Sequence, residues 1–187
     1  MNCLRAIALV IAAMMAIIGC ADSHNVIRHR KIANPVLLPE QKIYISVSRD
    51  GVYGDEAYPG SGLTLSQILL SSFVKHVRRV DVGDIYQPYI EALETARLKG
   101  YDILIFPTIL HWENHATEWN GVPDKVKVKV DVVRVDKDAL LDSVIVEGKS
   151  GLATFGGDYP QDLLPAPLER FVSSLFQSAN SAVQRTD

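Results

Sequence analysis

The segment from Lys125 to Val132 constrains the fold more than any other part of the chain. Apolar and charged residues alternate through it, with valines at positions 126, 128, 130 and 132 on one side. A period of two predicts a β-strand with one face in the core and the other in water. Residues 136–139 favour a turn, and the chain is predicted to return as a long strand from about Leu141 to Thr154. Residues 125–154 therefore predict a β-hairpin with one solvated, charged face.

Other apolar patterns predict the elements that complete a sheet and cover it. The continuous run Ile103–Phe106 is typical of a central strand that is buried on both faces, and Lys42–Ser48 alternates like a strand. A short strand is predicted at Val80–Val82, and helices are predicted from about Thr64, from Pro88 to Gly100 and from Pro167 to Val183. Thr64 and Gln67 have the spacing of a capping box.

The length of the chain favours one domain with one sizeable core. It has 187 residues and a formal net charge of −3, so it has no basic excess to attract nucleic acid. We expect a single compact α/β domain over residues 41–187, with a mixed sheet and helices packed on it. The expected order of its elements is β-α-β-α-β-β-β-α.

The N-terminus has the features of a lipoprotein signal peptide over residues 1–19. The apolar run Ala6–Ile18 is shorter than the ~20 residues that span a bilayer comfortably. It ends in Ile17-Ile18-Gly19-Cys20, which resembles the bacterial lipobox. This resemblance implies cleavage before Cys20, a diacylglycerol on its thiol and a fatty acid such as palmitate on its new amine. An ordinary secretory signal with a chance Cys and an uncleaved anchor are the alternatives.

Residues 20–40 are predicted to form the lipidated Cys20 and a flexible tether, because they are polar and interrupted by Pro35 and Pro39. In enterobacterial lipoproteins, Asp directly after the lipidated Cys favours retention in the inner membrane. Ala21 stands at that place, so the resemblance to this sorting rule implies an anchor in the outer membrane, with the domain facing the periplasm. Cys3 leaves with the signal peptide and Cys20 carries lipid. No disulfide or thiol chemistry is therefore expected.

The segment 111–121 is the richest in candidate functional side chains. If the preceding strand continues, His111, Glu113 and His115 share one face, and two imidazoles with a carboxylate could hold zinc or iron. No fourth ligand is evident, so a polar strand end is the simpler interpretation. Aromatic side chains in polar loops often serve interfaces. The candidate interaction surface consists of Trp112, Glu113, Glu118 and Trp119; ordinary packing of the two Trp residues is the alternative.

The loop Gly60-Ser61-Gly62 before the first predicted helix is a candidate anion or ligand site, because free N–H groups at a helix start attract anions. A tight loop that only leads into the helix is the simpler interpretation. The sequence lacks a P-loop, a Gly-x-Ser-x-Gly elbow, a His-Glu-x-x-His motif and a dinucleotide fingerprint. We therefore expect no catalytic residues, no enzymatic activity and no cofactor other than the covalent lipid.

Several segments together resemble a family of bacterial envelope lipoproteins, domain of unknown function 4823. They are the lipobox, residues 60–62, Trp112-Glu113, the run from Ala116 to Asp124 and residues 160–164. The resemblance implies an envelope location and no assigned activity. We expect a non-enzymatic, lipid-anchored protein that binds another envelope component through its α/β domain. The alternatives are a small-ligand or glycan binder between the Gly60 and Trp119 loops, and a metal-binding protein or hydrolase that uses His111, Glu113 and His115.

Overall fold

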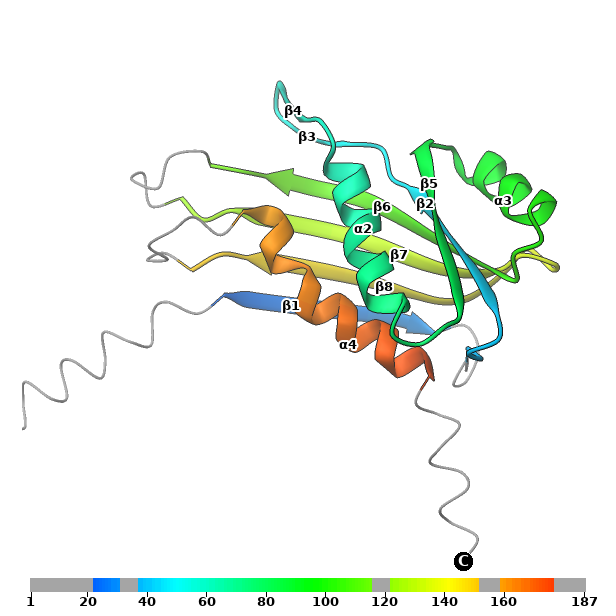
Figure 1. Ribbon diagram of the computed structural model, residues 1–187. Helices are drawn as coiled ribbons and strands as arrows, with labels where there is room; N and C mark the ends of the chain where they lie inside the picture. The colour runs from blue at the N-terminus through cyan, green and yellow to red at the C-terminus, as the bar shows by residue number, and fades with distance from the viewer. Residues whose placement is uncertain (1–21, 31–36, 116–121, 152–158, 177–187) are drawn as a thin grey trace, which may run out of the picture.

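A six-stranded mixed sheet organises the domain in the computed structural model, which describes residues 22–30, 37–115, 122–151 and 159–176 (Figure 1). The strands lie in the order β1-β8-β7-β6-β2-β5. β2 is parallel to both β5 and β6, whereas β6, β7, β8 and β1 form an antiparallel succession. The strands are β1 (Ser23–Arg30), β2 (Lys42–Val47), β5 (Arg79–Tyr86), β6 (Ile103–Glu113), β7 (Lys125–Arg134) and β8 (Ala139–Lys149).

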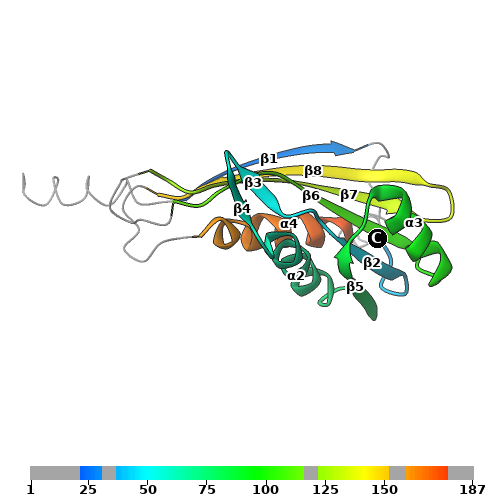
Figure 2. The same ribbon diagram turned by 90° about the horizontal axis from the view of Figure 1, so that it is seen from above.

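Helices lie on both faces of this sheet, but they cover different parts of it. α2 (Ser61–Phe73) and α4 (Pro165–Phe176) lie on one side of β1, β8, β7 and β6, as Figure 2 shows. Their buried residues, such as Leu65, Leu69 and Phe171, form the larger core with the apolar face of the sheet. α3 (Tyr89–Leu98) packs on the opposite face and forms a smaller core with residues such as Tyr44 and Leu104. α3 covers only part of this second face. The part of it that carries the lysines of β7 is left open to solvent.

Three short elements complete the described structure. A small hairpin of β3 (Gly51–Tyr53) and β4 (Glu56–Tyr58) leads into α2, and a 3₁₀-helix, η1 (Pro160–Leu163), precedes α4. No helix in the described ranges is long and apolar enough to cross a bilayer.

The predicted α/β domain and its principal hairpin are confirmed. The four alternating valines of β7 are at most 2% exposed, and the lysines between them lie on the opposite, wetter face. Ile103, Leu104 and Ile105 are fully buried, as expected for a strand that has a core on each side. The expected elements occur in the expected order, with β1, the β3–β4 hairpin and η1 added to them.

The flexible tether predicted for residues 20–40 is wrong over Ser23–Arg30, because these residues form β1. β1 pairs antiparallel with β8, with Val26 opposite Val146. It covers the backbone edge that β8 would otherwise expose. Arg28 reaches the fully buried carboxylate of Asp142, and His24 Nε2 lies 2.8 Å from the carbonyl oxygen of Leu163. Most of the strand remains exposed on both faces, so its sequence shows no apolar period.

Helix boundaries also differ from the prediction. α2 begins at Ser61, and the expected capping box does not form, because the Thr64 hydroxyl donates to the carbonyl of Gly60 instead. α4 begins at Pro165, two residues before the predicted start, and residues 177–183 of that predicted helix lie outside the described ranges. The predicted short strand at Val80–Val82 is the centre of the longer β5.

Candidate functional site

The start of α2 is already occupied by a carboxylate of the chain itself. Asp50 Oδ2 accepts a hydrogen bond from the Gly60 N–H at 3.0 Å, and its Oδ1 accepts one from the Gly62 N–H at 2.8 Å. Gly60 has a φ of 86°, which favours glycine, and a Cβ at Gly62 would lie only 2.1 Å from the Ser48 carbonyl oxygen. The predicted anion site at Gly60, Ser61 and Gly62 is therefore wrong, because Asp50 takes the place of the anion.

A pocket of about 340 Å³ nevertheless lies beside this loop. Its polar lining includes Ser61, Thr64, Asn114 and Gln161. Tyr58 and Asn114 also line a second pocket of about 590 Å³, whose other lining residues are Tyr53, Asp55, Glu56 and His115. Two concave regions therefore meet at Tyr58, near the predicted small-ligand cleft.

Trp112 belongs to the core and not to an interaction surface. It is 3% exposed, and its neighbour Gly51 lies so close that a Cβ there would be 2.5 Å from the Trp112 Cβ. Glu113 is buried as well. The predicted surface is therefore wrong for these two residues, because β6 continues to Glu113 and turns the indole toward the helices. Glu118 and Trp119 lie outside the described residues.

The Glu113 carboxylate is the centre of a hydrogen-bonded cluster on the opposite face of the sheet. Its oxygens accept from His111 Nε2 at 2.9 Å, from His115 Nε2 at 2.6 Å and from Lys125 Nζ at 3.1 Å. Burial raises the pKa of Glu113, but the hydrogen bonds from the two imidazoles and the ammonium outweigh burial and lower it to about 2. Glu113 is therefore an ionised structural carboxylate at neutral pH.

This geometry does not support the metal-binding alternative. His111, Glu113 and His115 do lie together, as predicted, but each Nε2 points at a carboxylate oxygen and not at a common point. Within the described ranges, no group of three or more His, Cys, Asp or Glu side chains is placed to hold a metal ion. The hydrogen bond from Lys125 to Glu113 could not be predicted from the sequence, because Lys125 lies on the neighbouring strand β7.

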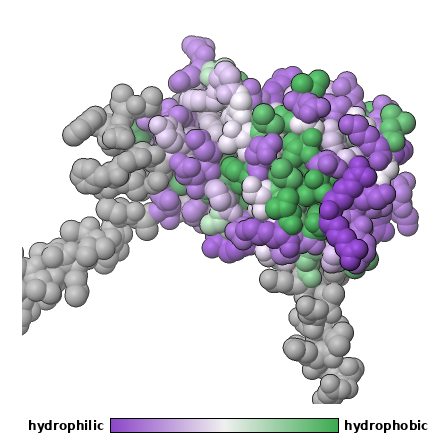
Figure 3. All heavy atoms as spheres, viewed as in Figure 1, coloured by the Kyte–Doolittle hydropathy of each residue, from purple (hydrophilic) through white to green (hydrophobic). Residues whose placement is uncertain are grey.

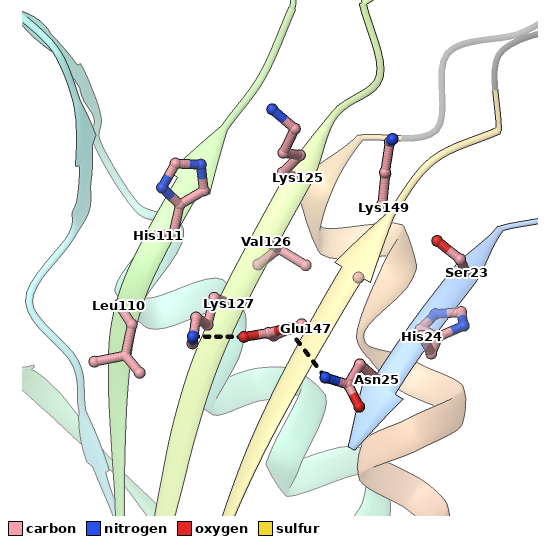
Figure 4. A pocket seen from close by; sticks show the side chains of 11 residues that line it. Ser23, His24, Asn25, Leu110, His111, Lys125, Val126, Lys127, Glu147 and Lys149 are labelled. Carbon is pink, nitrogen blue, oxygen red and sulfur yellow. Dashed lines mark hydrogen bonds and ion pairs between the residues drawn. The ribbon is translucent and has the colours of Figure 1, made fainter. Parts of the chain in front are cut away.

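A further pocket of about 510 Å³ lies on the open face of the sheet, across β1, β8, β7 and β6 (Figure 4). Lys125, Lys127, Lys149 and His111 contribute to its lining. Glu147 crosses its floor and accepts from Lys127 Nζ at 2.5 Å and from Asn25 Nδ2 at 3.3 Å. The lysine face was predicted from the sequence, but the pocket was not, because one of its walls is β1.

An apolar surface extends over α2 and the edge strand β5 (Figure 3). Its most exposed members are Leu63 and Val74 (53% exposed). Leu70, Val80 and Val82 are half-buried between them and the larger core. We call these five residues the α2–β5 surface. Sequence reasoning missed it because Leu63, Leu70 and Val74 recur at helical spacing, which also fits a core-facing stripe.

The fold is similar to that of PelC from Paraburkholderia phytofirmans, solved twice as a dodecamer. One of these structures is 14% identical, with a TM-score of 0.64, over 82% of this chain and 98% of PelC. The other is 16% identical, with a TM-score of 0.61, over 83% of this chain and 98% of PelC. A looser match is the lipoprotein GNA1162 from Neisseria meningitidis, 11% identical with a TM-score of 0.40, over 77% of this chain and 99% of that one. At these identities the PelC structures establish the fold alone.

No curated protein sequence matches this chain. A family model does match, over residues 36–175, which include β2 to β8, η1 and most of α4. The match contains both cores, the Asp50 cap of α2 and the Glu113 cluster. The chain therefore belongs to the family described as Domain of unknown function (DUF4823).

Proposed function

We propose that this protein is a non-enzymatic lipoprotein of the bacterial envelope, anchored through Cys20 in the outer membrane and facing the periplasm. Its α/β domain binds another envelope component and needs no cofactor. The lipobox at residues 17–20 supports the anchor. The family assignment is compatible with such a role.

The observation that carries the binding role is the α2–β5 surface. Leu63 and Val74 are exposed on the helix that lies beside β5, and β5 is an edge strand of the sheet that the described residues form. Soluble domains rarely leave a contiguous apolar patch next to an open sheet edge, because both features promote association. A partner that covers this surface removes apolar area from water and pairs the backbone groups of β5.

Another copy of this chain is the partner that we propose first. PelC, which shares the fold over nearly its whole length, was solved as a dodecamer. In this chain β1 and β5 are the two edges of the described sheet. Two different edges suit a heterologous contact, in which one surface of each copy meets another surface of the next. Such contacts form a closed ring when the rotation between copies closes and an open filament when it does not.

The anchor is tested in cells by fatty-acid labelling and membrane fractionation of the wild type and of a Cys20→Ser variant. We expect the label and the membrane association in the wild type and neither in the variant. An unlabelled wild-type protein would refute the lipoprotein assignment.

The binding role is tested by the mass of the lipidated protein in detergent, measured by light scattering. Val74→Lys places a charge on the α2–β5 surface, and Leu98→Lys places the same charge on α3, where Leu98 is 88% exposed. We expect a multiple of the protomer mass for the wild type and Leu98→Lys, and a smaller species for Val74→Lys. If the wild type is a monomer, a photo-crosslinker placed at position 63, or at position 98 as the control, tests whether a different envelope protein binds the α2–β5 surface. The absence of a crosslinked protein specific to position 63 would refute the binding role.

A small ligand or a glycan is a second candidate, favoured by the pockets on either side of Tyr58. Binding sites for small molecules are concave and place a few polar groups around an apolar or aromatic wall. The hydroxyls of Ser61 and Thr64, the amide of Asn114 and the ring of Tyr58 supply such groups. Chemical-shift changes on addition of peptidoglycan fragments, reduced by Asn114→Ala and unaffected by Leu98→Lys, would support this candidate.

A further inference from the structure

One end of the sheet lies only a few residues from Cys20. The residue before β1, Asp22, is fixed there, because its Oδ1 accepts a hydrogen bond from the Gly151 N–H at 3.1 Å. Ala21 is the only residue between Asp22 and Cys20. Two residues of extended chain span about 7 Å, whereas the twenty residues of a flexible tether would span up to ~70 Å. The docking of β1 therefore brings this end of the domain close to the lipid.

The start of β1, the end of β6, the start of β7 and the end of β8 all meet at this end (Figure 1). The strand register places Ser23 opposite Lys149, Lys149 opposite Lys125, and Lys125 opposite Glu113. Backbone hydrogen bonds fix the row, since the Ser150 N–H donates to the Asp124 carbonyl at 3.0 Å. We call this part of the domain the anchor end.

The exposed side chains of the anchor end suit a lipid surface. Lys149 is exposed, and the Lys125 side chain is 44% exposed although its ammonium also donates to Glu113. Val122 and Tyr159 (52% exposed) add an apolar and an aromatic side chain. η1, which Tyr159 directly precedes, lies beside the start of β1, because His24 Nε2 contacts the Leu163 carbonyl. Basic side chains attract headgroup phosphates, and aromatic side chains favour the boundary between lipid and water.

We propose that the anchor end rests on the bilayer that holds the lipid of Cys20, so that the domain stands upright on the membrane. This inference depends on the lipidation proposed above. Lys125 and Lys149 then face the phosphates of the lipid headgroups. The turn between β7 and β8, at the opposite end of the sheet, points away from the membrane into the periplasm.

Fluorescence quenching at two matched positions tests this orientation. The processed protein has no free thiol, so Lys149→Cys and Lys137→Cys each introduce a single site for a fluorophore. Both lysines are exposed. Lys149 is the last residue of the eleven-residue strand β8 and Lys137 precedes its start, so the two sites lie roughly 35 Å apart at about 3.4 Å per residue. The lipidated full-length protein is reconstituted into vesicles of phosphatidylethanolamine and phosphatidylglycerol that carry a short-range quencher on the headgroups.

We expect the label at position 149 to lose most of its fluorescence and the label at position 137 to keep nearly all of it. Equal quenching at the two positions would overturn the proposed orientation. Mass spectrometry and vesicle flotation distinguish this result from a failure of the anchor. A protein that carries no lipid and does not float with the vesicles refutes the lipoprotein assignment. A lipidated protein that floats but shows equal quenching at the two positions refutes only the orientation.

A longer link tests the cause of the orientation. An insert of about ten Gly and Ser residues between Ala21 and Asp22 adds an average reach of ~17 Å without changing the lipid or the domain. We expect quenching at position 149 to fall toward that at position 137. Unchanged quenching in the insertion variant would contradict the inference that the short link holds the anchor end against the bilayer.

Discussion

Replacement of Arg28 by Leu tests whether β1 is an integral strand of the domain. Arg28 Nε donates to Asp142 Oδ2 at 2.8 Å, its Nη1 donates to the Ser174 hydroxyl at 2.7 Å, and its guanidinium lies 5.0 Å from the centre of the Phe171 ring. The Asp142 side chain is fully buried and the Arg28 side chain is 20% exposed. Removing Arg28 takes its charge and its hydrogen bonds from the buried Asp142 carboxylate, and breaking a buried ion pair costs ~3–5 kcal/mol. Arg28 is partly exposed and Asp142 keeps other contacts, among them the hydrogen bond from the Ser143 N–H, so we expect a loss near the lower limit, at about 3 kcal/mol.

The free energy of unfolding, measured by urea denaturation of the mature chain with Cys20→Ser, is the assay. In an Asp142→Asn background, where the buried charge is absent and the Ser143 N–H keeps an acceptor, Arg28→Leu should cost only about 1 kcal/mol. His29→Ala, an exposed change on the same strand, should cost less than ~0.5 kcal/mol. If Arg28→Leu is as mild as His29→Ala, β1 is not docked on β8 and residues 20–40 are the flexible tether that the composition predicts.

The other predictions concern Trp112, Gly62 and Glu113, which the sequence marked as candidate functional residues and which have structural roles in the fold. Trp112→Ala should lower the free energy of unfolding by about 3–5 kcal/mol in the same assay, because it leaves a cavity in the core. A stability near that of the wild type would contradict the buried position of Trp112. Gly62→Ala should lower it by more than ~2 kcal/mol because of the clash with Ser48, whereas Ser71→Ala, an exposed change on the same helix, should be nearly neutral. The Glu113 pKa falls from 4.5 to about 2 on folding, so its ionisation contributes about 3 kcal/mol (the difference multiplied by ~1.36 kcal/mol). This contribution is complete above pH 4.5 and is lost as the pH falls through 2. In urea titrations, Glu113→Gln should therefore lower the free energy of unfolding at pH 7 but leave it nearly unchanged at pH 2. Equal losses at both pH values would contradict the lowered pKa of Glu113.

Features that depend on neighbouring residues could be predicted from the sequence. The alternating valines of β7, the apolar run in β6 and the punctuation of α3 by Pro88 and Gly100 each report a local period or a local backbone preference. The lipobox is likewise a continuous motif. These signals were sufficient for the α/β class, the principal hairpin, the order of the elements and the family.

Features that depend on contacts between distant residues were decided only by the tertiary structure. β1 has no apolar period, and what holds it is pairing with β8 and the ion pair of Arg28 with a residue 114 positions away. The candidate anion site at Gly60 is filled by Asp50, ten residues earlier in the chain, and the imidazoles considered as alternative metal ligands donate instead to Glu113. Trp112 faces the core because β6 continues through a register shift between Ile109 and His111. A single sequence records which residues can ionise, donate or pack, but the fold determines which of these groups meet and are thereby satisfied within the domain.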